Sequence, residues 1–273
     1  MIFCVLGAGY VGKAVLAHPL FSEQTFYATT RSQEKIKELL QLAKKAFLFQ
    51  SDEKETLKKI LSECDGVYIL VAPQKNESYE TAYLETAKSI EYALQGRTQP
   101  FFLLYTSSTF VYEGTQGSYL EEITLLTSKN PKANLLLETE NRYLSLANTF
   151  IKVAILRLGG IYGPGRELTQ RTKLLSNQSL SGTGKEPTNH IHLEDIVRAI
   201  SFCSNHCLQG IFNLVNDDHP IRKELYETLS RQLHIPPPLW NGETPTHGSG
   251  SIISNKKIKQ AGFSFNHPFL TQL

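Results

Sequence analysis

Three glycines near the start of the chain have the spacing of a phosphate-binding turn. Gly7, Gly9 and Gly12 form the pattern G-x-G-x-x-G between the apolar run Ile2–Leu6 and a segment with helical character. The first glycine allows a tight bend, the second lets the backbone approach a pyrophosphate, and the third lets the helix pack closely on the strand. The positive end of the helix then faces the phosphates. The spacing therefore predicts a dinucleotide site, although a glycine-rich turn without a ligand is the alternative.

The residues after the second apolar segment indicate which dinucleotide fits. In NAD-binding folds an acidic residue about 20 positions beyond the glycines accepts a hydrogen bond from the ribose 2′-hydroxyl. In this chain the segment Thr25–Thr30 leads into Arg31 and Ser32, without a carboxylate. An arginine fork and a serine hydroxyl suit a 2′-phosphate through charge-assisted hydrogen bonds. We therefore predict NADP in preference to NAD; the alternative is that Arg31 is a solvated loop charge.

Further cofactor contacts are expected at the ends of two later apolar segments. Ligands of open α/β sheets sit beyond the carboxyl ends of the parallel strands. Segments 66–73 and 100–105 are both apolar, and the second ends in a run of hydroxyl side chains. Together with the start of the first helix, they complete the predicted cofactor-binding set: Tyr10, Val11, Ala72, Pro73, Thr106 and Ser107.

The elements that must position these residues alternate between two kinds of pattern. Strands are predicted at 2–6, 25–30, 46–49, 66–73, 100–105 and 151–156. Helices are predicted at 33–45, 53–63, 77–94 and 133–148. Three strands interleaved with helices, followed by three more, make two mononucleotide-binding halves. The predicted fold is α/β, a Rossmann-type doubly wound parallel sheet with a small C-terminal substrate lobe.

The final third of the chain has a different pattern. Segment 167–186 is polar and irregular, a helix is predicted at 220–234, and short elements are predicted at 254–260 and 262–265. We predict a dinucleotide-binding domain over 1–160, to which 188–215 returns. A small substrate-binding lobe is predicted over 161–187 and 216–273.

Composition limits the classes of partner. The 273 residues are 41% hydrophobic, as in an ordinary globular protein. A net charge of +2 does not indicate a nucleic-acid or membrane partner. The apolar start lacks the basic region of a signal peptide, so we expect a cytoplasmic protein. Cys203 and Cys207 lie beside His206 without further ligands at the usual spacing, so we expect no metal site.

Several motifs, taken in order, resemble those of a known family. The chain resembles the extended short-chain dehydrogenase/reductases, the sugar-nucleotide epimerase/dehydratase group. The order and spacing of the motifs carry the resemblance, which covers nearly the whole chain. The main matching segments are Gly7–Gly12, Ser107–Tyr112, Arg157–Arg166 and His190–Ile196.

The resemblance implies a catalytic pattern that this chain does not complete. In that family a tyrosine acid/base and a lysine form a Tyr-x-x-x-Lys pair on the helix after the serine strand, and a serine orients the substrate. Ser108 stands at the position that resembles the catalytic serine. Counting from it, the tyrosine position falls at Ala133 or Asn134 and the lysine position at Leu137 or Glu138. None of the 12 tyrosines has a lysine four residues later.

Three tyrosines could replace the missing acid, although each could also be a packed aromatic. These are Tyr112, Tyr119 and Tyr162. Tyr162 follows the sixth predicted strand on the expected substrate side, so we predict Ser108 and Tyr162 as the catalytic residues.

Two classes of function agree with these motifs. The first is an NADP-dependent oxidoreductase or epimerase-like enzyme that acts on a small or nucleotide-linked substrate. The second is a non-catalytic NADP-binding redox sensor or regulatory protein, because the Tyr-x-x-x-Lys pair is missing. Proteins of the resembled family usually form dimers through their long helices, so the resemblance allows a homodimer.

Overall fold

The computed structural model describes all residues except 75, 116–118, 127, 244–249 and 271–273. Contacts within the chain gather its residues into two compact units. The first unit is Met1–Ser108, Pro131–Arg157 and Ile196–Phe212, and the second is Thr109–Asn130, Leu158–Asp195 and Asn213–Leu273. No helix in the described part of the chain is both long and apolar enough to cross a membrane.

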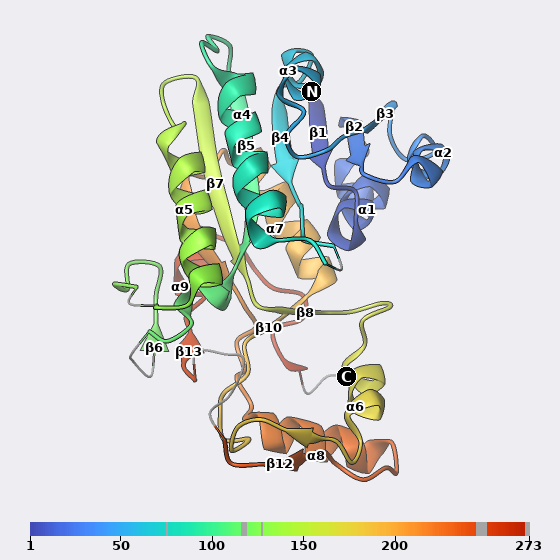
Figure 1. Cartoon of the computed structure of the whole chain (residues 1–273), viewed down its shortest axis with the longest axis vertical. Coiled ribbons are helices and arrows are strands. Elements are labelled where there is room, and N and C mark those ends of the chain that lie inside the picture. Colours follow the sequence, from blue (N-terminus) through green and yellow to red (C-terminus); the bar gives the residue numbers. More distant parts are fainter. Residues whose placement is uncertain (75, 116–118, 127, 244–249, 271–273) are drawn as a thin grey trace. The chain divides into compact units, whose positions relative to one another are not determined.

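A seven-stranded sheet forms the centre of the first unit (Figure 1). Its strands are β1 (Ile2–Leu6), β2 (Thr25–Thr30), β3 (Lys45–Leu48), β4 (Gly66–Ile69), β5 (Phe101–Ser108), β7 (Ile151–Leu158) and β11 (Gly210–Leu214). The order across the sheet is β3-β2-β1-β4-β5-β7-β11, and all pairs from β3 through β5 are parallel. The strand order reverses between β1 and β4, which is where such sheets bind ligands. The predicted Rossmann-type doubly wound sheet is confirmed.

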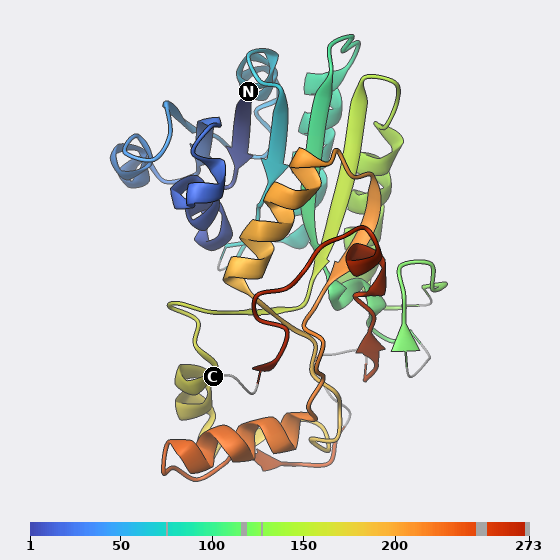
Figure 2. The same ribbon diagram turned by 180° about the vertical axis from the view of Figure 1, so that it is seen from behind.

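Helices cover both faces of this sheet. Figure 1 shows α4 and α5 in front of it, and Figure 2 shows α1 and α7 in front of the opposite face. The helices of the first unit are α1 (Tyr10–Ala17), α2 (Ile36–Leu39), α3 (Lys54–Ser62), α4 (Thr86–Leu94), α5 (Pro131–Ser145) and most of α7 (Leu193–Asn205). A sheet covered on both faces explains why its strands are almost continuously apolar.

The core of the first unit follows the alternation of side chains along β1. Cys4 packs in one cluster with Leu57 of α3 and Ile90 of α4. Its neighbour Phe3 points to the other face and stacks on Tyr68 of β4, with 4.8 Å between the ring centroids. All five side chains are buried, so β1 is fixed from both sides and the turn that follows it is held in place.

The second unit contains short strands paired two by two. The pairs are β8 (Gly160–Tyr162) with β10 (His190–His192), β9 (Ser179–Leu180) with β12 (Leu239–Trp240), and β6 (Tyr119–Leu120) with β13 (Ile252–Ile253). Its other helices are α6 (Leu168–Leu175), α8 (Arg222–Gln232) and α9 (Lys256–Gln260). A small apolar cluster ties α6 and α8 to β8 and consists of Tyr162, Leu168, Leu225, Leu229 and Leu270.

Several predicted elements differ from the structure. The helix predicted at 33–45 is a short 3₁₀ turn followed by α2, which ends at Leu39, and Lys45 already belongs to β3, where it pairs with Tyr27. The helix predicted at 77–94 begins instead with a π-helical segment, Glu80–Glu85. The segment 167–186, expected to be irregular, contains α6, and 262–265 forms no strand.

Candidate functional site

The glycine turn joins β1 to α1 in the first unit. Gly7 has φ of +93°, and its N–H donates to Thr29 Oγ1 at 3.0 Å, which ties the turn to β2. A Cβ on Gly12 would lie 2.6 Å from the carbonyl oxygen of Gly7, so a side chain at this position would push α1 away from the strand. A Cβ on Gly9 would meet no atom within 4 Å. The turn is therefore tight where helix and strand pack, and open at its middle glycine.

A small pocket of about 50 Å³, open to solvent, lies beside the turn. It is lined by Gly7, Thr29, Thr30, Arg31, Phe49, Ser51, Val71, Ala82 and Thr86. Most of this lining comes from the carboxyl ends of β1 and β2 and the residues after β3 and β4. Apolar walls with a few polar groups suit a nucleoside. Tyr10 and Val11 form the first turn of α1, where a helix leaves backbone N–H groups without intrahelical partners.

Arg31 does not stand alone at the end of β2. Its Nη1 donates to both carboxylate oxygens of Glu77, and its Nη2 donates to the carbonyl oxygen of Ala72 at 2.9 Å. The backbone N–H of Gln74 also donates to Glu77, at 2.7 Å. The predicted cofactor residues Arg31 and Ala72 are thus brought together, just before Pro73. The carboxylate that is missing from the end of β2 is supplied by the segment after β4.

Two hydroxyl side chains near the end of β5, those of Thr106 and Ser107, donate hydrogen bonds. Thr106 Oγ1 donates to the carbonyl oxygen of Ile69 at 3.3 Å. Ser107 Oγ donates to Glu140 of α5 at 2.6 Å, and Glu140 also accepts from Arg157 Nη2 at 2.6 Å. The side chains of Arg157 and Glu140 are only 3% and 1% exposed. Ser107 therefore belongs to a sealed ionic network that links β5, α5 and β7.

A family model identifies what kind of protein has this arrangement. The model described as the NAD dependent epimerase/dehydratase family matches residues 3–214, which is most of the chain. The chain belongs to the NAD-dependent epimerase/dehydratase family. A search of curated proteins finds no match.

Solved structures of members and relatives of this fold are similar along almost the whole chain. MoeE5 in complex with UDP-glucose and NAD is 18% identical, with a TM-score of 0.81 over 99% of this chain and 95% of that one. UDP-glucuronic acid 4-epimerase from Bacillus cereus, in complex with UDP-glucuronic acid and NAD, is 17% identical with a TM-score of 0.79. That match covers 95% of this chain and 92% of the epimerase. At such identities the likeness shows the shared fold.

A third structure gives the same result for a dehydratase. dTDP-glucose 4,6-dehydratase from Bacillus anthracis in complex with NAD is 17% identical, with a TM-score of 0.79. The match covers 98% of this chain and 92% of the dehydratase. The epimerase/dehydratase fold therefore extends over both units of this chain.

The positions expected for the Tyr-x-x-x-Lys pair, Ala133 or Asn134 and Leu137 or Glu138, all lie on α5. Ser108 is the last residue of β5 and is half-buried. Ala133 is fully buried in the first turn of α5, and Leu137, one turn later, is half-buried. The alternative positions, Asn134 and Glu138, are exposed, and the Glu138 carboxylate pairs with Arg142 at 3.1 Å.

Tyr162 lies in β8 of the second unit, apart from α5 in the sequence. It is 2% exposed, and its hydroxyl accepts from Asn216 Nδ2 at 3.0 Å. Burial raises the pKa of Tyr162, so the phenol keeps its proton at neutral pH. The remaining candidate tyrosines, Tyr112 and Tyr119, act as donors. Tyr112 donates to Asn213 Oδ1 at 2.9 Å, and Tyr119 donates to Ser254 Oγ at 2.8 Å.

Histidines surround Tyr162 in the second unit. The ring of His192 lies 5.0 Å from that of Tyr162 and 3.7 Å from that of His267. His267 Nε2 lies 2.8 Å from Glu194 Oε2. Ligand atoms of His192, Glu194 and His267 lie within 4.8 Å of one another. The contacts of this group within the protein are the tilted packing of the two imidazole rings and the pairing of His267 with Glu194.

Two acidic residues of the first unit were missed by the sequence analysis. Glu140 shares a helix face with Leu136 and Tyr143, which are both buried. An acidic residue four positions after one apolar residue and three before another lies on the apolar face of a helix, which predicts a buried carboxylate with a partner. The sequence pattern around Glu140 could therefore have identified it. Glu77 had no such signal, because its partner Arg31 is 46 residues away and only the sheet order brings them together.

Proposed function

We propose that this family member binds a nicotinamide dinucleotide along the carboxyl edge of β1, β2 and β4. The observation that carries the proposal is the open side of Gly9 in a turn that is otherwise tightly packed, next to the pocket beside Gly7. Phosphates would occupy the open side, where the start of α1 faces them. The similar solved structures named above hold NAD according to their titles, which supports the class of cofactor.

We further propose NADP as the preferred form of the cofactor. Arg31 and Ser32 follow β2 without a carboxylate, and Arg31 lines the pocket. Its planar guanidinium can bind a phosphate through two parallel hydrogen bonds. Both contacts would be made by residues of the first unit, so this preference can be measured by binding alone.

The proposed activity is an oxidoreductase or epimerase-like reaction on a nucleotide-linked substrate. Hydride transfer is the chemistry that the cofactor supplies when bound. Ser108 would hold a substrate hydroxyl or carbonyl by a hydrogen bond, and Tyr162 is the candidate proton donor in place of a Tyr-x-x-x-Lys pair. UDP-sugars in two similar structures support the substrate class. The second unit would then act as the substrate lobe. We also propose a cytoplasmic location, because free cysteines such as the four in this chain are common there.

One experiment separates this enzyme from a redox sensor that only binds the cofactor. NADPH or NADP⁺ consumption is followed with a panel of carbonyl compounds and UDP-sugars, for the wild type and Ser108→Ala. Product formation from the UDP-sugars is followed by NMR as well, because an epimerase-like reaction returns the hydride to its substrate and consumes no cofactor. The enzyme predicts turnover that Ser108→Ala reduces by at least about tenfold without changing the Kd for NADPH. Tight NADPH binding with no turnover on any substrate would favour the sensor, and no binding would contradict both.

A further inference from the structure

The ion pair between Arg31 and Glu77 lies at the end of β2, where the proposed site would distinguish NADP from NAD. Arg31 lines the pocket, and its side chain is 26% exposed while that of Glu77 is 15% exposed. If the proposed dinucleotide site is correct, we infer that Glu77 is a specificity-determining residue that limits the preference for NADP conferred by Arg31. This role rests on the proposed function and extends it to a residue on a different loop.

The ion pair occupies the donors that a 2′-phosphate would need. Arg31 Nη1 donates to both oxygens of Glu77, and Nη2 donates to the carbonyl oxygen of Ala72. A guanidinium binds a phosphate through parallel N–H groups of the same fork. A 2′-phosphate must therefore displace Glu77 or approach Arg31 from another side. A 2′-hydroxyl has no such requirement, so the pair penalises NADP and not NAD.

Glu77 stays near Arg31 even when their ion pair opens. Its carboxylate accepts from the backbone N–H of Gln74 at 2.7 Å, and its own N–H donates to the Gln74 carbonyl oxygen at 3.0 Å. These two bonds form a closed turn that fixes the acidic side chain on its own loop. A phosphate at Arg31 would consequently lie close to a carboxylate of like charge, which opposes binding in a partly buried site.

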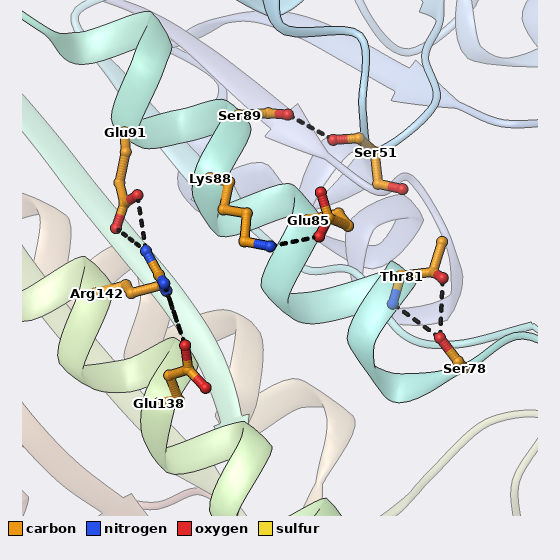
Figure 3. A network of polar contacts seen from close by, with 9 residues as sticks. All are labelled: Ser51, Ser78, Thr81, Glu85, Lys88, Ser89, Glu91, Glu138 and Arg142. Atoms are coloured by element: carbon orange, nitrogen blue, oxygen red, sulfur yellow. Dashed lines mark hydrogen bonds and ion pairs between the residues drawn. The ribbon is translucent and has the colours of Figure 1, made fainter.

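A second arginine–glutamate pair in the same unit provides a matched control. Arg142 of α5 donates to Glu91 of α4 at 3.1 Å and to Glu138 at 3.1 Å (Figure 3). The side chains of Arg142 and Glu91 are 33% and 29% exposed, so this pair is partly exposed, like Arg31 and Glu77 at 26% and 15%. Neither residue lines the pocket beside Gly7. Removing the charge of Glu91 therefore shows how the loss of a partly exposed carboxylate away from the pocket affects nucleotide affinity.

The test measures Kd by calorimetry for NADP, NAD, adenosine 2′,5′-bisphosphate and 5′-AMP. The proteins are the wild type, Glu77→Gln, Arg31→Ala, the double variant and Glu91→Gln. Glu77→Gln keeps the size of the side chain and removes its charge. We expect it to tighten NADP and the bisphosphate by about tenfold and to leave NAD and 5′-AMP within about twofold. Arg31→Ala in the same chain should abolish the gain, and Glu91→Gln should change no Kd.

The outcomes separate this inference from the function on which it rests. If the wild type binds none of the four ligands, the proposed function fails and the inference fails with it. If the ligands bind but Glu77→Gln leaves the ratio of NADP to NAD affinity unchanged, only the role of Glu77 is overturned. A loss of NAD affinity in Glu77→Gln also overturns it, because Glu77 would then bind the ribose hydroxyls directly. Circular dichroism of each variant shows whether the fold is retained.

Discussion

Two arginine–glutamate pairs in the first unit have the same chemistry in different surroundings. Glu140 of α5 and Arg157 of β7 have 1% and 3% of their side chains exposed. Arg31 and Glu77 lie at the pocket with 26% and 15% exposed. The first pair is sealed from any ligand. The second pair can be reached from the pocket, so it can exchange one partner for another.

The difference shows how burial separates a structural charge from one available to a ligand. A buried pair is costly to break, because the remaining charge has lost its water and finds no other partner. A partly exposed pair is weakened by solvent and contributes little to stability. Breaking the buried pair should therefore change mainly the stability of the fold, and breaking the exposed pair should change mainly ligand binding.

The largest expected effect is on stability and comes from Glu140→Gln. This change keeps the shape of the side chain and removes the negative charge that Glu140 places against the buried Arg157, which should cost about 3–5 kcal/mol of unfolding free energy. Urea denaturation followed by circular dichroism measures the loss. Replacing Glu140 and Arg157 together by Met should recover much of it, since no charge is then left buried. A loss below about 1 kcal/mol in Glu140→Gln would place this pair with the exposed ones.

His190 extends the comparison to a buried group without a charged partner. Burial, together with the nearby charges of Arg171 and His219, lowers its pKa to about 4. The folded state keeps His190 neutral, while the unfolded chain takes up a proton below about pH 6.5. Stability contributed by this group should therefore be lost as the pH falls from about 6.5 to 4, by about 3 kcal/mol in total.

The check on His190 is the unfolding free energy of the wild type and His190→Gln between pH 7 and pH 5. The wild type should lose stability more steeply than the variant over this range, because only the wild type has the depressed pKa. Parallel curves would mean that other groups cause the pH dependence.

The sequence predicted the scaffold better than it predicted these pairs. The glycine spacing and the apolar strands are patterns of residues close together in the sequence. The sheet and its turn could therefore be predicted directly. The helix predicted at 33–45 was too long, because α2 ends at Leu39 and Lys45 already belongs to β3. Glu77 could not be found, since its meeting with Arg31 depends on the strand order rather than on any local motif.

Arg31→Ala is expected to have a moderate effect on binding and little on stability. It removes the guanidinium proposed to hold a 2′-phosphate, so the Kd for NADP should rise by about tenfold or more while that for NAD stays within about twofold. Titration with both cofactors measures this. An equal loss for both would show that Arg31 only supports the shape of the pocket, and equal affinity for both in the wild type would end the preference for NADP.

The smallest effect should come from Glu91→Gln on the surface of α4. Its pair with Arg142 is about one-third exposed on each side, and Glu138 still pairs with the arginine after the change (Figure 3). We expect a loss below about 1 kcal/mol and no change in the Kd of any nucleotide. If Glu91→Gln lost as much unfolding free energy as Glu140→Gln, the exposure of the side chains would not explain why the pairs differ in their contribution to stability.

The most direct test of the dinucleotide site is a calorimetric titration of Gly9→Val with NADP and NAD. A Cβ at this position would meet no protein atom within 4 Å, but φ of −87° with ψ of −144° lies outside the usual α and β regions, so the melting temperature of the variant is measured beside its binding. The new side chain would fill the space proposed for the phosphates, so both dinucleotides should bind at least about tenfold more weakly than to the wild type. Unchanged binding by Gly9→Val, or no binding of either dinucleotide by the wild type, would contradict the proposed site.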